Sequence, residues 1–337
     1  MSILIVGGAG YIGSQTAKCV AQAGLEPVVF DNLVYGHKWA VKWGPLIEGD
    51  LADGALIKRV LEEHAVTAVV HFAAYAYVGE SVTNPRKYYR NNVAGTINLL
   101  DAMLDAGVRD IVFSSTCATY GEPQRVPIAE DHPQNPVNPY GETKLTVEKM
   151  LHWYGRAYGL RYAALRYFNA AGADPDLEIG EDHDPETHLI PLAIEAALGG
   201  KALEIYGTDY PTPDGTAVRD YIHVQDLADA HVAALAKLRA GATSLSVNLG
   251  TGRGHSVRQV IAAVEKVSGK KLAVRETGRR AGDPPALVAD ARLAADVLGW
   301  NARIPDIETI VAHAWRWTQG RLDESRPGRA ASGVTRT

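Results

Sequence analysis

The sequence predicts an α/β protein with a doubly wound, parallel sheet and a smaller α/β domain after it. Two observations carry this prediction. Short apolar runs alternate with helix-length segments through the first half of the chain, and a glycine-rich turn, GGAGYIG at 7–13, follows the first apolar run. Continuous apolar strands that alternate with helices are typical of a parallel sheet covered by helices on both faces.

The elements of the first half follow one another without a long gap. The expected strands are SILIV (2–6), PVVF (27–30), TAVVHFAA (67–74), DIVFSS (110–115) and RYAALRYF (161–168). The expected helices are 11–24, 53–64, 84–107 and 139–159. In the third of these helices, Asn84 and Pro85 form a start signal and Gly107 ends the pattern. We assign these elements to a first domain over residues 1–168.

After Phe168 the pattern changes. Residues 173–188 form an acidic, proline-containing loop, and mixed short strands and helices follow. We expect a second domain over 169–320, although SLSVNLG (244–250) is expected to return to the main sheet, so that segments near 215–250 belong with the first domain. The polar tail, 321–337, is expected to be flexible.

Composition excludes several classes of protein. The chain has 337 residues and a net charge of −5, and no basic stripe combines with aromatic residues, so nucleic acid is not an expected partner. No apolar stretch reaches the roughly 18 residues that span a bilayer, which excludes a membrane partner. Two cysteines, Cys19 and Cys117, give no disulfide framework and fit a reducing compartment. We therefore expect a cytoplasmic protein.

The glycine-rich turn predicts a dinucleotide site of the Rossmann type. Gly7 allows the tight turn, Gly10 lets the backbone approach a pyrophosphate, and Gly13 lets helix and strand pack closely. The second strand ends at Asp31, whose carboxylate can accept from ribose hydroxyls and repels a 2′-phosphate, which favours NAD over NADP. Asp50 is placed either to meet the adenine or to cap a helix.

A tyrosine and a lysine stand four residues apart in NPYGETK (138–144) and therefore share a helix face. A phenol with its ordinary pKa of about 10 is a poor base at neutral pH. The ammonium of Lys144 is expected to lower the pKa of Tyr140, and an oxidised nicotinamide ring would add to this effect. A hydroxyl at the end of the strand 110–115 should bind the same substrate oxygen. Thr116 is the first choice and Ser115 is its competitor.

These residues belong to a longer set of matching blocks. GGAGYIG (7–13), Asp31-Asn32, GESV (79–82), SSTCATYG (114–121), PYGETK (139–144), LRYFNAAGA (165–173), GTAVRDYIHVQDLA (215–228), NLGTG (248–252) and RRAGDPPALVAD (279–290) occur in the order found in the UDP-galactose 4-epimerases. The chain resembles that family, a branch of the extended short-chain dehydrogenases/reductases, over about residues 1–318.

The resemblance implies that the chain keeps NAD bound and inverts C4 of a UDP-sugar such as UDP-glucose or UDP-galactose. Tyr140 would take the proton from O4 while hydride passes to the nicotinamide, and the 4-keto sugar would turn over before hydride returns. The implied NAD-binding residues are Gly7, Gly10, Tyr11, Ile12, Gly13, Asp31, Asn32, Asp50, Leu51, Phe72, Ala73, Asn91, Tyr140, Lys144 and Phe168. The implied sugar-nucleotide residues are Thr116, Asn169, His188, Leu189, Tyr206, Arg219, Arg280 and Asp283. The family also implies a homodimer.

The chain departs from the family pattern at a few positions. Ala76 stands where some epimerases carry a lysine near the nicotinamide. His188 stands where many have asparagine, and Leu287 stands at the gatekeeper position. Several blocks also resemble epimerases of UDP-xylose and UDP-arabinose, so a pentose or an N-acetylated hexosamine remains an alternative substrate.

Other functions fit the sequence less well. Sugar-nucleotide dehydratases need an acid and a base after the threonine, and decarboxylases need a glutamate, whereas this chain has Cys117 and Ala118. A non-catalytic NAD-binding regulator would be expected to lose Tyr140 or Lys144. The loop with His183, Asp184 and His188 lacks a rigid helix or the paired-cysteine spacing of a metal site, so we expect no metal there.

Overall fold

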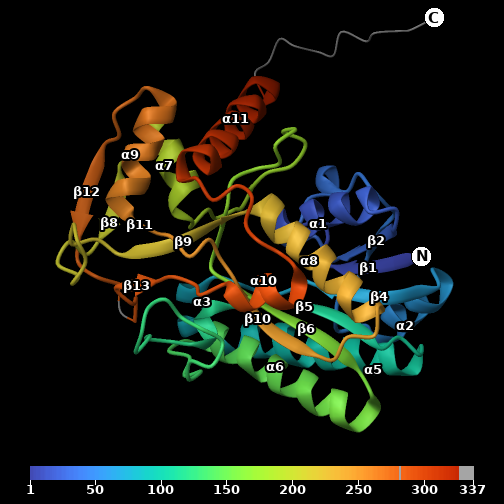
Figure 1. Ribbon diagram of the computed structural model, residues 1–337. Helices are drawn as coiled ribbons and strands as arrows, with labels where there is room; N and C mark the ends of the chain where they lie inside the picture. Colours follow the sequence, from blue (N-terminus) through green and yellow to red (C-terminus); the bar gives the residue numbers. More distant parts are fainter. Residues whose placement is uncertain (281, 326–337) are drawn as a thin grey trace, which may run out of the picture.

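The computed structural model describes residues 1–280 and 282–325. A seven-stranded parallel sheet and its helices occupy one side of the molecule, and a smaller group of strands and helices lies beside them (Figure 1). Both groups contain residues from distant parts of the chain, because β10 (Leu245–Leu249) pairs with β6 (Arg161–Tyr167) at the edge of the large sheet. The expected return of 244–250 to the main sheet is therefore confirmed, whereas residues 218–223, also expected with the first domain, form a strand of the smaller group.

The large sheet has the strand order β10-β6-β5-β4-β1-β2-β3. Its other strands are β1 (Ser2–Val6), β2 (Glu26–Asp31), β3 (Leu46–Glu48), β4 (Val66–His71) and β5 (Asp110–Thr116). β1 lies between β2 and β4, and every pairing in the sheet is parallel. The order of the strands reverses beside β1, so a crevice is expected at the carboxyl ends of these strands, where open α/β sheets bind ligands.

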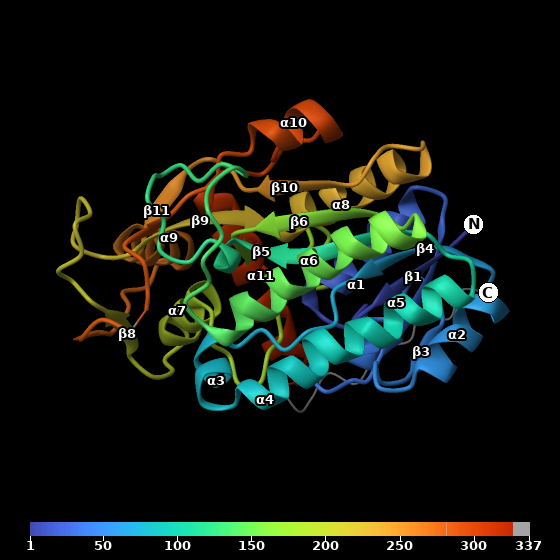
Figure 2. The same cartoon turned by 90° about the horizontal axis from the view of Figure 1, so that it is seen from below.

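Helices cover both faces of this sheet (Figures 1 and 2). One layer contains α1 (Tyr11–Gln22), α8 (Val224–Arg239) and α10 (Arg292–Leu298). The other contains α2 (Gly54–Glu63), α5 (Gly95–Asp105) and α6 (Pro139–Tyr158). In β1, Ile3 and Ile5 belong to the first core, while Leu4 and Val6 belong to the second. Since successive strand residues face opposite ways, a wholly apolar strand can fill both cores.

The smaller group is built around β9 (Val218–His223), which pairs with β7 (Asn169–Ala171), β11 (Gly254–Ser256) and β13 (Ala286–Leu287). A second pair of strands, β8 (Leu203–Tyr206) and β12 (Val274–Thr277), lies next to it. Its helices are α7 (Leu189–Ala197), α9 (Val257–Ser268) and α11 (Ile307–Ser325). Buried residues of α7, α9 and α11 form a core of their own, separate from the two cores of the large sheet.

The single helix expected over 84–107 is wrong. After the short helix α3 (Val78–Thr83), the segment consists of α4 (Pro85–Tyr88), a π-helical turn η2 (Tyr89–Ala94) and α5. The start signal at Pro85 is in place, but the Asn84 side chain makes no capping hydrogen bond. The π-helical turn presents the buried Asn92 amide to both backbone groups of Tyr75, at 2.9 and 3.0 Å. This partner is distant in sequence, so helical periodicity cannot indicate the interruption.

Two remaining expectations concern the C-terminal tail and membrane-spanning segments. α11 continues through Ser325, so residues 321–325 are helical, and the rest of the expected flexible tail lies outside the described residues. Two short 3₁₀ turns, η1 (Lys38–Ala40) and η3 (Cys117–Thr119), complete the described elements. Within the described part of the chain, no helix is both long enough and apolar enough to cross a membrane.

Candidate active site

A cleft of about 1950 Å³ opens at the carboxyl ends of the large sheet and reaches the smaller group of strands. All but one of the residues that the sequence assigned to the cofactor and the sugar nucleotide line it, together with Ala76 and Leu287. The exception is Asp50, which is not part of the lining. The sequence therefore placed nearly all of its assigned residues on one cleft, although the motifs are spread over more than 270 residues.

The glycine turn fits a dinucleotide pyrophosphate. A Cβ atom at Gly7, whose φ is +81°, would lie 2.6 Å from the Ala73 nitrogen, and one at Gly13 would lie 2.2 Å from the Gly7 carbonyl oxygen. Either substitution would push the turn apart. At Gly10 the nearest atom to an added Cβ is 3.5 Å away, so this glycine leaves its side of the turn open. Gly10 is also the N-cap of α1, where backbone N–H groups favour an anion.

The end of β2 carries a carboxylate held in a fixed orientation. Asp31 accepts from the backbone N–H groups of Ala9, at 2.9 Å, and Leu33, at 2.8 Å. Burial raises the pKa of Asp31, and these two hydrogen bonds oppose that effect. Asp50 accepts from the Asn32 amide at 2.7 Å. It does not cap α2, because that cap is Asp53, whose side chain accepts from the backbone N–H of Leu56.

Tyr140 and Lys144 lie on the first turns of α6, as the motif predicts. Asn138 caps this helix by accepting from the Gly141 N–H at 2.9 Å, and Pro139 occupies its first turn. The Lys144 ammonium donates to the Ser114 carbonyl oxygen at 2.8 Å and lies 5.9 Å from the centre of the Tyr140 ring. The pair thus shares one wall of the cleft, opposite the smaller group of strands.

Burial governs the protonation of this pair. Desolvation raises the pKa of Tyr140 well above its ordinary value, a nearby Tyr167 adds to the rise, and a hydrogen bond with Thr116 opposes it. Desolvation also lowers the pKa of Lys144 to about 7. The expected lowering of the Tyr140 pKa by Lys144 is therefore not found in the protein alone, where desolvation is the largest influence on the pKa of each group.

The two hydroxyl candidates at the end of β5 face different surroundings. Thr116 lines the cleft and hydrogen-bonds with Tyr140. Ser115 is fully buried on the other side of the strand, where it donates to Glu148, the buried partner of Arg166. Successive residues of a strand point to opposite faces, which accounts for the difference. The geometry favours Thr116 as the hydroxyl next to Tyr140.

Two arginines line the far end of the cleft. Arg219 is nearly buried, forms an ion pair with Asp283 and donates to the Pro284 carbonyl oxygen at 2.8 Å. The Arg280 guanidinium lies 3.8 Å from the centre of the Tyr206 ring, in stacking contact. The alternative that these arginines are ordinary surface ion-pair partners does not fit Arg280, which stacks on an aromatic ring of the cleft wall.

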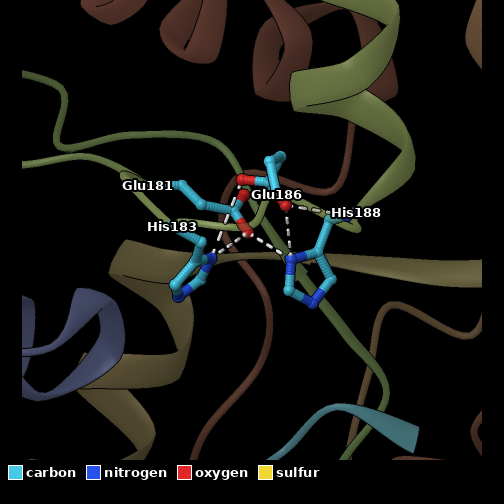
Figure 3. A group of neighbouring side chains, drawn as sticks. All are labelled: Glu181, His183, Glu186 and His188. Atoms are coloured by element: carbon cyan, nitrogen blue, oxygen red, sulfur yellow. Dashed lines mark hydrogen bonds and ion pairs between the residues drawn. The ribbon is translucent and has the colours of Figure 1, made fainter. Parts of the chain in front are cut away.

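The acidic loop is more ordered in its contacts than the expected solvated loop. His183 and His188 both turn Nδ1 toward the carboxylates of Glu181 and Glu186 (Figure 3). All four residues line the cleft, and of the four only His188 was assigned to the site from the sequence. His183 was considered from the sequence only as a metal ligand and set aside, and Glu181 and Glu186 were not considered, because their convergence depends on the path of the loop, which a sequence pattern does not define.

Aromatic residues near the cofactor turn were also missed. Tyr35, Tyr75 and Tyr77 line the cleft, and their rings make edge contacts with centres 5.7 and 5.2 Å apart. The Lys87 ammonium lies 4.2 Å from the centre of the Tyr75 ring and forms an ion pair with Glu80. The sequence AYAYVGE contains two of these tyrosines, and their alternation was the available signal.

The parallel sheet, the glycine turn and the tyrosine–lysine pair define an extended short-chain dehydrogenase/reductase. Comparison with known proteins narrows this class. The family described as "NAD dependent epimerase/dehydratase family" matches residues 3–250, and this chain belongs to it.

Individual relatives extend the match over nearly the whole chain. A UDP-glucose 4-epimerase of Halalkalibacterium halodurans is 51% identical over 318 residues, which cover 94% of this chain and 95% of the relative. The crystal structure of UDP-glucose 4-epimerase from Brucella ovis in complex with NAD is 56% identical, with a TM-score of 0.92 over 94% of this chain and 97% of that one. A UDP-glucose 4-epimerase structure from Stenotrophomonas maltophila, with bound NAD and formylated UDP-arabinopyranose, is 40% identical, with a TM-score of 0.93 over 96% of this chain and 100% of that one.

Proposed function

We propose that this chain is a UDP-sugar 4-epimerase that interconverts UDP-glucose and UDP-galactose with NAD as a resident cofactor. The observation that carries this proposal is the convergence of Tyr140, Lys144 and Thr116 in one cleft with the glycine turn. The relatives of nearly equal length are named UDP-glucose 4-epimerases, and both solved structures named above contain NAD.

The NAD site is assigned to the residues nearest the turn and the adjoining strand ends. The backbone at Gly10 would receive the pyrophosphate, and Asp31 would accept from the adenosine ribose. The same wall contains the other expected cofactor residues, Tyr11, Ile12, Gly13, Asn32, Leu51, Phe72, Ala73, Asn91 and Phe168. Asp50 does not line the cleft, so it would influence the cofactor through Asn32, whose amide donates a hydrogen bond to it. When bound, NAD accepts the C4 hydrogen of the sugar as hydride and returns it.

The residues of the chain manage the proton on O4. Tyr140 takes that proton as the phenolate, which would form when the positive charges of Lys144 and of a bound nicotinamide ring lower its pKa, and it returns the proton when the C4 carbonyl is reduced. Thr116 hydrogen-bonds with Tyr140, which holds the phenol in place and favours its ionised form. Lys144, fixed by the Ser114 carbonyl, supplies a positive charge beside the phenol when it is protonated. Lys144 is almost fully buried, and a sugar bound over the partly exposed Tyr140 would shield the pair from water, so the proton would be exchanged with the sugar rather than with solvent.

The sugar nucleotide is assigned to the far wall. Arg219 and Arg280 suit a pyrophosphate because a guanidinium makes paired, charge-assisted hydrogen bonds. Asp283 would fix Arg219 through their ion pair. The other residues proposed for this wall are Asn169, His188, Leu189 and Tyr206. With the nucleotide held at one end, the keto sugar can turn and present its opposite face to the cofactor.

The residues next to Thr116 argue against elimination of water or carbon dioxide. Cys117 and Ala118 both line the cleft at the positions where dehydratases and decarboxylases need an acid or a base. Burial raises the pKa of the Cys117 thiol to about 12, so it stays protonated near neutral pH and is a poor base. Epimerisation needs only the hydroxyl–phenol–ammonium set and accounts for the site better.

The choice of sugar is a finer proposal. Leu287 lines the cleft and is shorter than a tyrosine, and Ala76 leaves space where a lysine could stand. Both features are compatible with UDP-xylose or UDP-arabinose and with N-acetylated hexosamines. Equilibration of UDP-glucose, UDP-galactose, UDP-GlcNAc, UDP-xylose and UDP-L-arabinose without added cofactor, followed by proton NMR, decides between them. We expect the fastest equilibration with the UDP-glucose and UDP-galactose pair.

The direct test of the mechanism is Tyr140→Phe. We expect this variant to lose turnover by about 100-fold or more, because general acid–base catalysis contributes about 10²- to 10⁴-fold. It should still retain NAD and bind UDP, measured by absorbance of released dinucleotide and by calorimetry. Turnover within a few-fold of the unmodified chain would remove Tyr140 from its assigned role.

We also propose a cytoplasmic homodimer with two domains, 1–168 and 169–320, in which α8, β10 and α10 return from the second segment to the first domain. Its two cysteines are buried and unpaired, which suits a reducing compartment. α5 and α6 lie along the same face and expose Ile97, Trp153 and Tyr158, an apolar set suited to packing against a second copy (Figure 2). Light scattering should give twice the chain mass, and Trp153→Glu should shift the equilibrium toward the monomer.

A further inference from the structure

Four potential metal ligands converge in the loop that precedes α7. Glu181, His183, Glu186 and His188 occupy alternate or nearby positions within eight residues. One ligand atom from each lies within 4.8 Å of all the others. In Figure 3 the two imidazole rings lie on either side of the two carboxylates and direct Nδ1 inward. No step of the proposed sugar chemistry uses Glu181, His183 or Glu186.

The distances within this cluster are close to those of a tetrahedral ion. His183 Nδ1 lies 3.2 Å from Glu181 and 3.7 Å from Glu186. His188 Nδ1 lies 2.7 Å from Glu181 and 3.0 Å from Glu186. Four ligands bonded to zinc at about 2.0–2.2 Å in a tetrahedron stand about 3.3–3.6 Å apart. The four histidine–carboxylate distances thus differ from the tetrahedral values by about 0.1–0.9 Å, so modest side-chain movements would convert the cluster into a coordination shell.

The charges around this cluster distinguish it from a second group of acidic residues nearby. Asp174, Asp176 and Glu178 also meet the distance criterion, but the ammonium of Lys18 lies among them at 2.7, 2.9 and 2.7 Å. The Lys18 ammonium thus already occupies the centre of that second group. Among the residues that the structure describes, Glu181 and Glu186 form ion pairs only with imidazoles and with no lysine or arginine.

The absence of a lysine or arginine partner matters because the carboxylates of Glu181 and Glu186 are shielded from water. The side chains of Glu181 and Glu186 are only 7% and 17% exposed. Buried carboxylates need a positive partner. Two protonated imidazoles would provide it, and so would one divalent ion bound by two neutral imidazoles. The second arrangement gives the same net charge and makes four bonds to a single centre.

Hydrogen bonds with the backbone and with α11 also hold the two glutamates of the cluster in place. The Glu186 carboxylate accepts from the backbone N–H groups of Thr187 and His188, both at 2.7 Å. The Glu181 backbone carbonyl accepts from the Trp317 indole of α11 at 3.3 Å. Hydrogen bonds of this kind orient metal ligands and limit the entropy lost on binding.

We propose that Glu181, His183, Glu186 and His188 form a binding site for one divalent transition-metal ion, with Zn²⁺ the best match. Imidazole and carboxylate together suit zinc better than magnesium or calcium, which prefer oxygen alone. The ion has a structural role. It joins the loop to the start of α7, and the His183 ring touches the Tyr11 ring at the glycine turn, with centres 6.3 Å apart. It would thereby brace the wall between the cofactor turn and the sugar-nucleotide residues.

The test uses untagged, full-length protein with its bound dinucleotide, dialysed against a chelator and then against buffer with a small excess of Zn²⁺ or Co²⁺. We expect one equivalent of metal per chain by elemental mass spectrometry. Bound Co²⁺ should show the strong visible absorption of a four-coordinate N/O site. In the double variant Glu181→Gln, His183→Gln, metal affinity should fall by about 100-fold or more, because two bonds to the ion are lost.

Glu178→Gln is the matched control, since it removes a carboxylate from the cluster that Lys18 already fills. It should bind metal as the unmodified chain does. Circular dichroism checks that each variant is folded, and a folding defect in the double variant leaves the measurement on the unmodified chain decisive. Less than about a tenth of an equivalent bound, or equal binding by the unmodified chain and the folded double variant, would overturn the proposal and leave an imidazolium–carboxylate network. The sugar chemistry would be unaffected by that result, so the two proposals fail independently.

Discussion

Replacing the buried lysine of the active site should make the cofactor-free protein more stable while it removes activity. Lys144 is 3% exposed, and its pKa is lowered from 10.5 to about 7 by desolvation. Between these two values the unfolded chain binds more protons than the folded chain, so this group makes stability rise with pH across that window. Proton linkage gives a penalty of about 4 kcal/mol at pH 7 and about 2 kcal/mol at pH 9.

Lys144→Met keeps the length of the side chain and removes this penalty. It also removes the hydrogen bond to the Ser114 carbonyl, which offsets the gain by about 1 kcal/mol. We therefore expect the variant to exceed the unmodified chain in free energy of unfolding by about 3 kcal/mol at pH 7 and by about 1 kcal/mol at pH 9. This gain in stability should be accompanied by a loss of epimerase activity, because residues that serve catalysis often lower the stability of the folded protein.

The assay is urea denaturation of protein freed of dinucleotide, followed by circular dichroism at several pH values from 7 to 9. Lys149→Met, on the exposed side of the same helix, is the matched control and should change stability by less than about 0.5 kcal/mol at every pH. The reasoning is refuted if Lys144→Met is no more stable than the unmodified chain at pH 7, or if the difference between them does not shrink as the pH rises.

Two further substitutions test the neighbouring strand and its buried support. Thr116→Val should lower kcat by about 100-fold, in the range found when a donor to a reacting oxygen is removed, whereas Ser115→Ala should change kcat by less than about 3-fold because its hydroxyl faces away from the cleft. Equal effects of the two substitutions would contradict the assignment. Glu148→Gln leaves the Arg166 guanidinium buried without its carboxylate and should lower the free energy of unfolding by about 3–5 kcal/mol, measured by urea denaturation. A loss below about 1 kcal/mol would show that this pair is not desolvated as the structure indicates.

Local patterns were sufficient to predict most of the large sheet. Apolar runs of four to eight residues fall on β1, β2, β4, β5, β6 and β10, and the glycine turn lies between β1 and α1 as expected. The helix α6 begins at Pro139 and is followed by Gly159 in the left-handed region, at φ 72°, both of which the sequence signals. These features depend on neighbouring residues, which is why they can be predicted from one sequence.

Features that depend on distant contacts were not predicted. The π-helical turn before α5 meets the backbone of Tyr75, and the orientation of Ser115 follows from which side of β5 faces α6. The pKa of Tyr140 was expected to be lowered, because a sequence shows the nearby ammonium but not the loss of water around it. The convergence of Glu181 and His183 likewise depends on the path of a loop without helical or strand periodicity.

The central claim is that the hydrogen on the sugar carbon stays within the site while that carbon is inverted. UDP-galactose incubated with the protein in heavy water, and followed by proton NMR, tests it most directly. The account predicts that UDP-glucose forms with protium retained at C4 and no deuterium gained there. Deuterium at C4 at a level that rises with turnover would contradict it.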